Sequence, residues 1–279
     1  MAEASAQRVG PLEPAAATAA AAPLMGARGV THHIAIGTPM HWGLCSDVYN
    51  DSVMRLDRAL RKDGSKLSII PVGNESLVQR ARNTIAWHFL ERKDATHLLF
   101  VDSDTGFRVE DVARMQAAGK PVIVGPCPLK AINWNRVAAA VKAGVVPDDL
   151  HRHTGFFNVV RLPGETRICA DEPFEIKWGG SGFMLIERGV LQQLSSVTPD
   201  YANRMPGKAM PPGVRVKNFF PVEIEEDDLL SEDFGFCAAW RRIGGTVWAA
   251  PWCEIDHAGT YVFTGRYRDW IKSQQAVPT

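Results

Sequence analysis

The stretch THLLFVDSD, residues 96–104, decides how this 279-residue chain folds. Its run Leu98–Val101 is continuously apolar, which is typical of a strand in a parallel sheet that helices cover on both faces. Asp102, Ser103 and Asp104 follow directly. In open α/β sheets ligands bind beyond the carboxyl ends of such strands, so the stretch predicts a buried strand that ends at a binding site.

Short β-rich runs alternate with helical stretches on both sides of this strand. Upstream, the pattern predicts strands over 32–39 and 66–73 and a helix over 76–92 with Ser76 as its N-cap. Downstream it predicts a helix over 109–118 and a buried strand over 121–128. This order favours an α/β fold in which right-handed crossovers join parallel strands.

The second half of the chain has a less regular pattern. FFNVVRL (156–162) and FEIKW (174–178) are typical of antiparallel strands, GFMLIERGVLQQLS (182–195) of a strand that runs into a helix, and TVWAAP (246–251) of a late strand. We therefore expect a Rossmann-like, mixed and mostly parallel sheet flanked by helices, with a small antiparallel ribbon. The stretch 197–228 has no clear period, and loops of that length are usually functional or mobile.

The composition excludes several classes of protein. Lys and Arg number 31 and Asp and Glu also number 31, and this zero net charge argues against a nucleic-acid partner or a polybasic membrane anchor. The five cysteines are scattered and form no C-x-x-C, which favours reduced thiols and a cytoplasmic protein over a disulfide framework or a zinc ribbon. No apolar run approaches the roughly 20 residues of a transmembrane helix.

The chain divides by composition into a tail and one domain. Residues 1–28 are rich in Ala and Pro, have few large side chains to bury, and are expected to be disordered. They lack the basic start of a signal peptide. Residues 29–279 are expected to form a single domain.

The acidic pair after the buried strand suits a divalent cation. Asp102 and Asp104 are spaced i, i+2, so in extended chain both carboxylates point the same way. Hard oxygen ligands select Mg²⁺ or Mn²⁺, which keep open positions for substrate phosphates. The same residues also suit a turn that closes a strand, and the residues by themselves leave both interpretations open.

A second acidic pair opens a late helix. Ser231, Glu232 and Asp233 begin the stretch SEDFGFCAAWRRIGG (231–245), where serine at the N-cap and acids in the first turn are ordinary helix chemistry. The alternative is that the helix N-terminus keeps a carboxylate ionised, so that it accepts a proton from an attacking hydroxyl. His257 follows the last strand, where it is either a structural histidine or a metal ligand.

Taken together, these elements resemble the GT-A fold glycosyltransferases, and most closely the small bacterial, phage and large-virus proteins of that kind. The resemblance covers about residues 32–265. It rests on the order of six short motifs: Ala81-Arg82-Asn83, Thr96–Phe100, Asp102-Ser103-Asp104, the glycine loop Gly179–Gly182, Ser231–Cys237, and His257.

The resemblance implies a nucleotide-sugar donor, first of all a UDP-sugar, a divalent metal (Mn²⁺ or Mg²⁺) and a glycan or other hydroxyl acceptor. It implies that Asp104 and His257 bind the metal, with Asp102 helping through the ribose or the metal shell. Asp233 would be the general base of an inverting reaction, with Glu232 in reserve. The residues implied to hold the donor are Thr38, Pro39, Arg82, Asp102, Ser103, Asp104, Lys130, Gly180 and Ser181.

Three alternatives to a glycosyltransferase remain. A haloacid-dehalogenase-type phosphatase also ends a buried strand with two aspartates, but it needs Thr or Val four residues after the first, where this chain has Gly106. A nucleotidyltransferase typically carries a glycine-rich, basic loop after its first strand, and GTPMHWGLCSD (37–47) lacks the basic residues. The third alternative is a module that binds a nucleotide sugar or a glycan without turnover.

Overall fold

The structure is a computed structural model that describes residues 32–164, 170–204, 210–211, 213–225 and 227–261. The expected disordered tail, 1–28, lies outside these ranges. Within them, no helix is long and apolar enough to cross a membrane.

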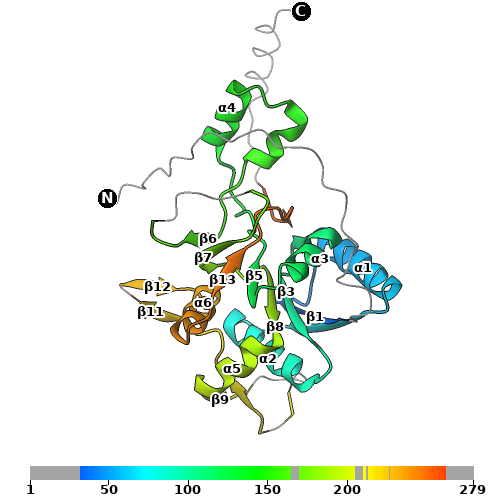
Figure 1. Cartoon of the computed structure of the whole chain (residues 1–279), viewed down its shortest axis with the longest axis vertical. Helices are drawn as coiled ribbons and strands as arrows, with labels where there is room; N and C mark the ends of the chain where they lie inside the picture. Colours follow the sequence, from blue (N-terminus) through cyan, green and yellow to red (C-terminus); the bar gives the residue numbers. More distant parts are fainter. Residues whose placement is uncertain (1–31, 165–169, 205–209, 212, 226, 262–279) are drawn as a thin grey trace, which may run out of the picture.

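An eight-stranded mixed sheet forms the centre of the described chain (Figure 1). Its order is β2 (Lys66–Gly73), β1 (His33–Met40), β3 (His97–Val101), β8 (Phe183–Glu187), β5 (Val122–Val124), β13 (Val247–Ala249), β7 (Phe174–Gly179) and β6 (Val159–Arg161). The pairings make β8 and β7 antiparallel to their neighbours, so the other strands of this sheet all run in one direction. The predicted mixed, mostly parallel α/β sheet is confirmed.

Helices cover both faces of the sheet. On one face lie α2 (Val78–Glu91), α5 (Arg188–Val197) and α6 (Glu232–Arg242), and on the other lie α1 (Asp47–Lys62) and α3 (Val109–Ala117). Leu98 and Phe100 of β3 pack into the first layer, whereas Leu99 and Val101 pack into the second, and all four are fully buried. The apolar run of β3 is continuous because each of its faces meets a helical layer.

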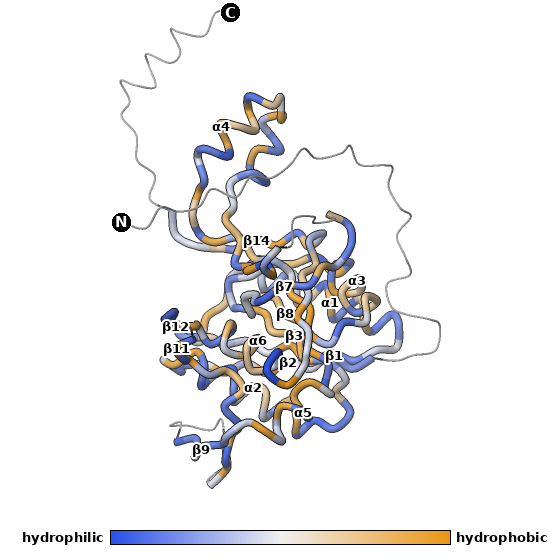
Figure 2. The backbone as a smooth tube through the Cα atoms, turned by 60° about the vertical axis from the view of Figure 1, so that its left-hand side comes forward, coloured by the Kyte–Doolittle hydropathy of each residue, from blue (hydrophilic) through white to orange (hydrophobic). Residues whose placement is uncertain are grey.

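A helical arm projects from the body of the fold. It consists of α4 (Trp134–Lys142) and a 3₁₀ helix, η1 (Pro147–His153), and it stands apart from the layered sheet in both views (Figures 1 and 2). At its base the chain leaves and returns side by side, since Leu129 N donates to Phe156 O at 2.7 Å and Asn133 N donates to Thr154 O at 2.8 Å.

Three short antiparallel pairs complete the described structure. They are β9 (Asp200–Ala202) with β10 (Arg215–Lys217), β11 (Glu223–Glu225) with β12 (Asp228–Leu230), and β4 (Thr105–Gly106) with β14 (Asp256–His257). The β4–β14 pair sets His257 opposite Thr105. Through it the end of the chain reaches the turn that follows β3.

One local prediction is wrong. Helix α2 begins at Val78 with Leu77 at the N-cap position, not at Ser76. The buried carboxylate of Glu75 accepts the Leu77 N–H at 2.9 Å, just before the first helical residue, and the N-cap side chain makes no capping hydrogen bond.

Gly235 lets α6 approach the backbone of Pro221. A Cβ added at Gly235 would lie 1.9 Å from the Pro221 carbonyl oxygen. We expect Gly235→Ala to lower the free energy of unfolding by about 1–3 kcal/mol, because overpacking outweighs the better helix propensity of alanine. Urea unfolding measures this. Gly189→Ala in α5 is the matched control, since nothing lies within 4 Å of its Cβ position. Equal effects of the two substitutions would contradict the close approach.

Candidate functional site

The candidate site lies at the carboxyl ends of β1 and β3. A cavity of about 300 Å³ opens there. Its walls come from the ends of the two strands, the start of α2 and the turn after β3, namely Pro39, His41, Glu75, Ser76, Val78, Arg82, Asp102, Ser103 and Asp104. Five residues proposed from the sequence to hold a donor nucleotide therefore line this cavity, namely Pro39, Arg82, Asp102, Ser103 and Asp104.

Asp104 and His257 lie side by side although 153 positions separate them in the chain. His257 Nε2 is 3.5 Å from Asp104 Oδ1, and Ala258 N donates to Asp104 O at 2.8 Å. The other ring nitrogen, Nδ1, donates to the Pro128 carbonyl at 2.7 Å, which fixes the ring and turns Nε2 toward the carboxylate. The second carboxylate oxygen of Asp104 accepts a hydrogen bond from Lys130 Nζ.

These contacts shift the two titrating groups in opposite directions. Burial raises the pKa of Asp104, but the hydrogen bonds and charges of His257 and Lys130 outweigh it and lower that pKa to about 2. The hydrogen bond to Asp104 raises the pKa of His257, against the opposing effect of burial. Asp104 is therefore a carboxylate over the whole physiological pH range.

Arg82 connects the end of β3 to the start of α6. Its guanidinium, carried on α2 and almost fully buried, donates through Nη2 to Asp102 at 2.9 Å and through Nε to Glu232 at 3.2 Å. Burial lowers the pKa of Arg82, but the charges of Asp102, Glu232 and Asp233 more than restore it, so the net shift is upward. Nη1 is buried and has no hydrogen-bond partner among the described residues.

Asp233 is held from three sides at the first turn of α6. Oδ1 accepts the hydroxyl of Ser231 and the Phe234 N–H at 2.9 Å, and Oδ2 accepts Asn158 Nδ2 at 3.4 Å. Ser231 occupies the N-cap position but makes no side-chain bond to the helix backbone, since its hydroxyl is directed to Asp233. The ordinary capping interpretation therefore does not describe this serine.

The environment of Cys127 shows that the acidic groups converge. Burial and then the negative charges of Asp102, Asp104 and Asp233 raise the pKa of this thiol, and Arg82 opposes them. The sulfur also lies 3.4 Å from the Cβ position of Gly182, which in turn is 3.2 Å from Asp102 Oδ2. Carboxylates from two distant segments, the turn after β3 and the start of α6, thus act on one thiol that stays protonated.

The glycine loop between β7 and β8 packs against the same groups. Gly180 N donates to Asn158 O at 3.0 Å, and a Cβ at Gly180 would come within 2.7 Å of Asn158 Nδ2. Ser181 is fully buried, and its hydroxyl has no hydrogen-bond partner in the described part of the chain. Gly180 therefore acts on Asp233 through the position of Asn158.

Thr38 does not line the cavity. Its side chain is fully buried, and its hydroxyl bonds to the hydroxyl of Tyr49 in α1 at 2.7 Å. Pro39, the next residue, does line it. The side chain of Thr38 thus supports the strand end behind the cavity.

The Asp104–His257 pair fits a divalent cation. Two cis ligands of such an ion lie about 3 Å apart, close to the 3.5 Å between His257 Nε2 and Asp104 Oδ1. A carboxylate oxygen and a neutral imidazole nitrogen are both common metal ligands. No group of three or more His, Cys, Asp or Glu in the described ranges has the arrangement to hold an ion. A cation here would need further oxygens from water or from a substrate.

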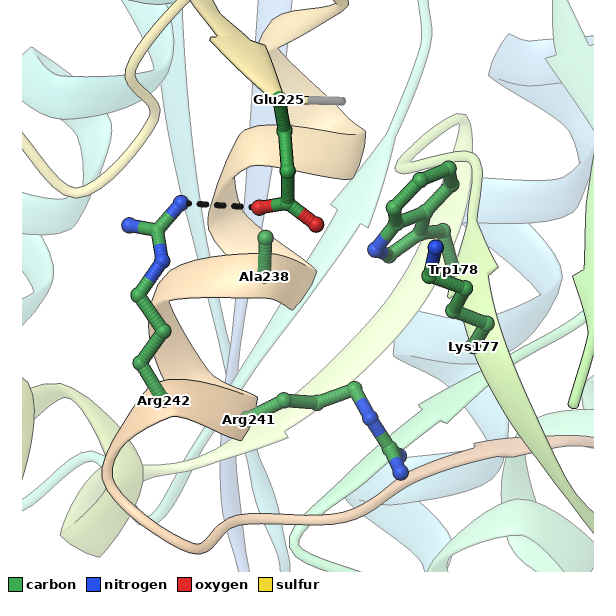
Figure 3. Close-up of a pocket in the computed structure, with 6 residues that line it drawn as sticks. All are labelled: Lys177, Trp178, Glu225, Ala238, Arg241 and Arg242. Atoms are coloured by element: carbon green, nitrogen blue, oxygen red, sulfur yellow. Dashed lines mark hydrogen bonds and ion pairs between the residues drawn. The ribbon is translucent and has the colours of Figure 1, made fainter.

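A second cavity, of about 260 Å³, lies between α6, β7 and the β11–β12 hairpin (Figure 3). Its basic groups are already engaged. Arg242 binds Glu225 at 3.2 Å, Arg241 binds Glu175 at 2.8 Å, and the Lys177 ammonium lies 3.9 Å from the centre of the Trp178 ring. None of the residues proposed from the sequence lines this cavity.

The sequence reasoning missed several residues of the candidate site, among them Glu75 and Asn158. Glu75 is buried in the cavity wall, where it binds Arg80 at 2.6 Å, and Asn158 contacts both Gly180 and Asp233. Glu75 lies in a turn of unremarkable sequence. Asn158 lies in a stretch interpreted as strand, where an asparagine among β-formers was the only available signal.

Comparisons with known proteins give likeness at the level of the fold. No protein-family model and no curated protein matches the chain. Among solved structures, A197 from STIV is 16% identical, with 82% of this chain and 87% of that chain covered and a TM-score of 0.47. GalNAc-T7 with UDP, GalNAc and Mn²⁺ is 11% identical, with 83% and 44% covered and a TM-score of 0.41. HddC from Yersinia pseudotuberculosis complexed with GMP-PN is 8% identical, with 81% and 93% covered and a TM-score of 0.38.

Removing the Arg82 guanidinium should destabilise the fold. We expect Arg82→Met to cost about 3–5 kcal/mol, because it leaves Glu232 and the partly exposed Asp102 without their shared cation. Arg55→Met is the control, since the Arg55–Asp51 pair is well exposed and should contribute less than about 1 kcal/mol. Unfolding of both variants in guanidinium chloride measures the difference in the free energy of unfolding. Indistinguishable values would show that Arg82 is not the tie between β3 and α6.

The raised pKa of His257 should be visible by NMR. Titration of its ring resonances should give a pKa above the ordinary 6.5, and Asp104→Asn should lower it. The stabilisation from the protonated ring is fully present below pH 6.5 and is lost as the pH rises through the raised pKa. Asp57→Asn, in an exposed pair on α1, should leave the titration of His257 unchanged. An unchanged titration in Asp104→Asn would refute the contact.

Proposed function

We propose that this chain is a metal-dependent glycosyltransferase that moves a sugar from a nucleoside-diphosphate sugar to an acceptor hydroxyl with inversion. One observation carries the proposal: Asp104 and His257 lie 3.5 Å apart in space after β3, and Arg82 links Asp102 at the end of β3 to Glu232, the neighbour of Asp233. A cation position and a separate carboxylate are the two parts that such a reaction needs.

The donor diphosphate is proposed to lie in the 300 Å³ cavity. Arg82 lines this cavity, and a guanidinium is suited to phosphate oxygens. Asp104 and His257 would hold Mn²⁺ or Mg²⁺, which when bound supplies Lewis-acid stabilisation of the charge on the departing diphosphate. Asp102 is directed to Arg82, so its role is to hold that guanidinium in place.

Asp233 is proposed to be the general base. It would take the proton of the acceptor hydroxyl as the acceptor oxygen forms a bond to the anomeric carbon and the bond from that carbon to the diphosphate oxygen breaks. Ser231, Phe234 N and Asn158 hold its carboxylate in place, and this supports proton transfer because a base must be positioned before it acts. Glu232 is the weaker candidate, since its carboxylate accepts from Arg82.

Substitution of Asp233 tests the assignment. Asp233→Asn should lower transfer at least about a hundredfold while donor binding survives, because an amide cannot accept the proton. Asp228→Asn, an exposed acid near the same helix, is the control and should keep its activity. Full turnover in Asp233→Asn would refute the base, whereas donor binding without turnover in the wild-type chain would favour a non-catalytic binding module.

A thermal-shift screen tests the donor class. We expect a nucleoside diphosphate to raise the melting temperature more with Mn²⁺ than without it, since a ligand that binds only the folded chain stabilises it. UDP and Mn²⁺ are the first probes, being the ligands in the GalNAc-T7 structure. The response should be lost in Asp104→Asn. The absence of a response to any nucleotide, with or without Mn²⁺, would contradict the proposed function.

A further inference from the structure

Lys130 binds the same carboxylate that a divalent cation would bind. It lies in the loop from β5 to the arm, and its ammonium bonds to Asp104 Oδ2 while Oδ1 faces His257. Its aliphatic stem crosses Gly259, where an added Cβ would lie 2.7 Å from Lys130 Cδ. Packing of the stem over Gly259 thus directs the ammonium to Asp104.

The backbone on both sides of Lys130 is fixed. Leu129 N donates to Phe156 O at 2.7 Å, Ala131 N donates to Leu129 O at 2.7 Å, and the preceding carbonyl, Pro128 O, accepts His257 Nδ1. The side chain itself is partly exposed, with 40% of its surface accessible. A flexible stem on a fixed backbone allows the ammonium to leave Asp104 without any movement of the fold.

Lys130 and a divalent cation cannot share Asp104 without strong repulsion, because like charges a few ångströms apart interact strongly in half-buried surroundings. The protein also offers the ion only Asp104 and His257, and no group of three or more His, Cys, Asp or Glu in the described ranges could hold it. A bound diphosphate would supply the oxygen ligands that the ion lacks. Its negative charge would also attract the ammonium away from Asp104 and so lower the repulsion.

We infer that Lys130 is an internal competitor for the divalent cation and makes cation binding depend on the nucleoside diphosphate. In the free chain the ammonium neutralises Asp104 and weakens cation binding. When the diphosphate binds, the ammonium moves from Asp104 to the phosphate oxygens, and the ion takes the carboxylate. By linkage, the cation strengthens diphosphate binding by the same factor. The inference rests on the proposed function, because it assumes a diphosphate in the cavity.

Titration of Mn²⁺, followed by the electron paramagnetic resonance of the free ion, tests this with and without UDP. In the wild-type chain UDP should tighten Mn²⁺ binding about tenfold or more. Lys130→Met keeps the stem over Gly259 and removes the charge. It should bind Mn²⁺ alone about tenfold more tightly than the wild-type chain, and UDP should tighten it less than about threefold.

Two further variants sharpen the experiment. Lys130→Arg keeps a cation at this position and should retain the wild-type dependence on UDP. Lys142→Met removes an exposed lysine on α4 of the arm and should titrate as the wild-type chain does. Lys130→Gln is the substitute if Lys130→Met fails to fold, and circular dichroism checks each variant before titration.

The outcomes separate this inference from the proposed function. If Lys130→Met binds Mn²⁺ no more tightly than the wild-type chain, while UDP and Mn²⁺ still stabilise both, the competitor is refuted and the proposed function stands. If Asp104→Asn leaves Mn²⁺ binding intact, the ion binds elsewhere and the inference fails. If no chain binds Mn²⁺ with or without UDP, both the competitor and the metal-dependent function are refuted.

Discussion

The candidate site depends on one buried guanidinium, that of Arg82. Arg82 is 3% exposed and donates to Asp102 at the end of β3 and to Glu232 at the start of α6. A guanidinium taken out of water must be paired, since an unpaired charge in the interior costs several kcal/mol. Because its two partners come from elements 130 positions apart, folding brings the first acidic segment to the second. The location of Asp233 follows from this pairing, since it is the neighbour of Glu232.

The charged residues of the site form two groups, one around Arg82 and one around Asp104, and the two groups have different roles. In the first group, the buried guanidinium of Arg82 binds Asp102 and Glu232 and fixes the positions of these carboxylates. Around Asp104, the carboxylate is held by Lys130 and His257, each of which has an alternative state, one by swinging away and the other by losing a proton. The first group gives the site its rigidity, and the second gives it the capacity to exchange one positive charge for another.

The arm connects with the second group at its base. Pro128 and Lys130, which begin the segment leading to α4, contact His257 and Asp104 respectively, and Asn158, which ends the returning segment, contacts Asp233. The excursion of the chain through α4 and η1 therefore begins and ends at the candidate site. The structure thus joins the most prominent projection of the fold to its most highly charged interior.

Local sequence was sufficient for many elements of the fold, although it gave no prediction of α1, of α4 or of the short strands β9 to β12. The alternation of apolar runs and helical periods predicted β1, β2, β3, α3, α5 and α6 close to their observed bounds, because period and capping act within a few residues. It was also sufficient to mark Asp102, Asp104 and Asp233 as candidates by their places at a strand end and a helix start.

Local sequence did not predict the contacts between distant segments. The hydroxyl of Thr38 bonds to Tyr49, Asn158 contacts Asp233, and Lys130 contacts Asp104. The sequence by itself determined the strands and helices that have a clear period and the acids that stand at their ends. Only the tertiary structure decided which charges face one another, because pairing depends on distances in space that sheet order, crossovers and packing set together.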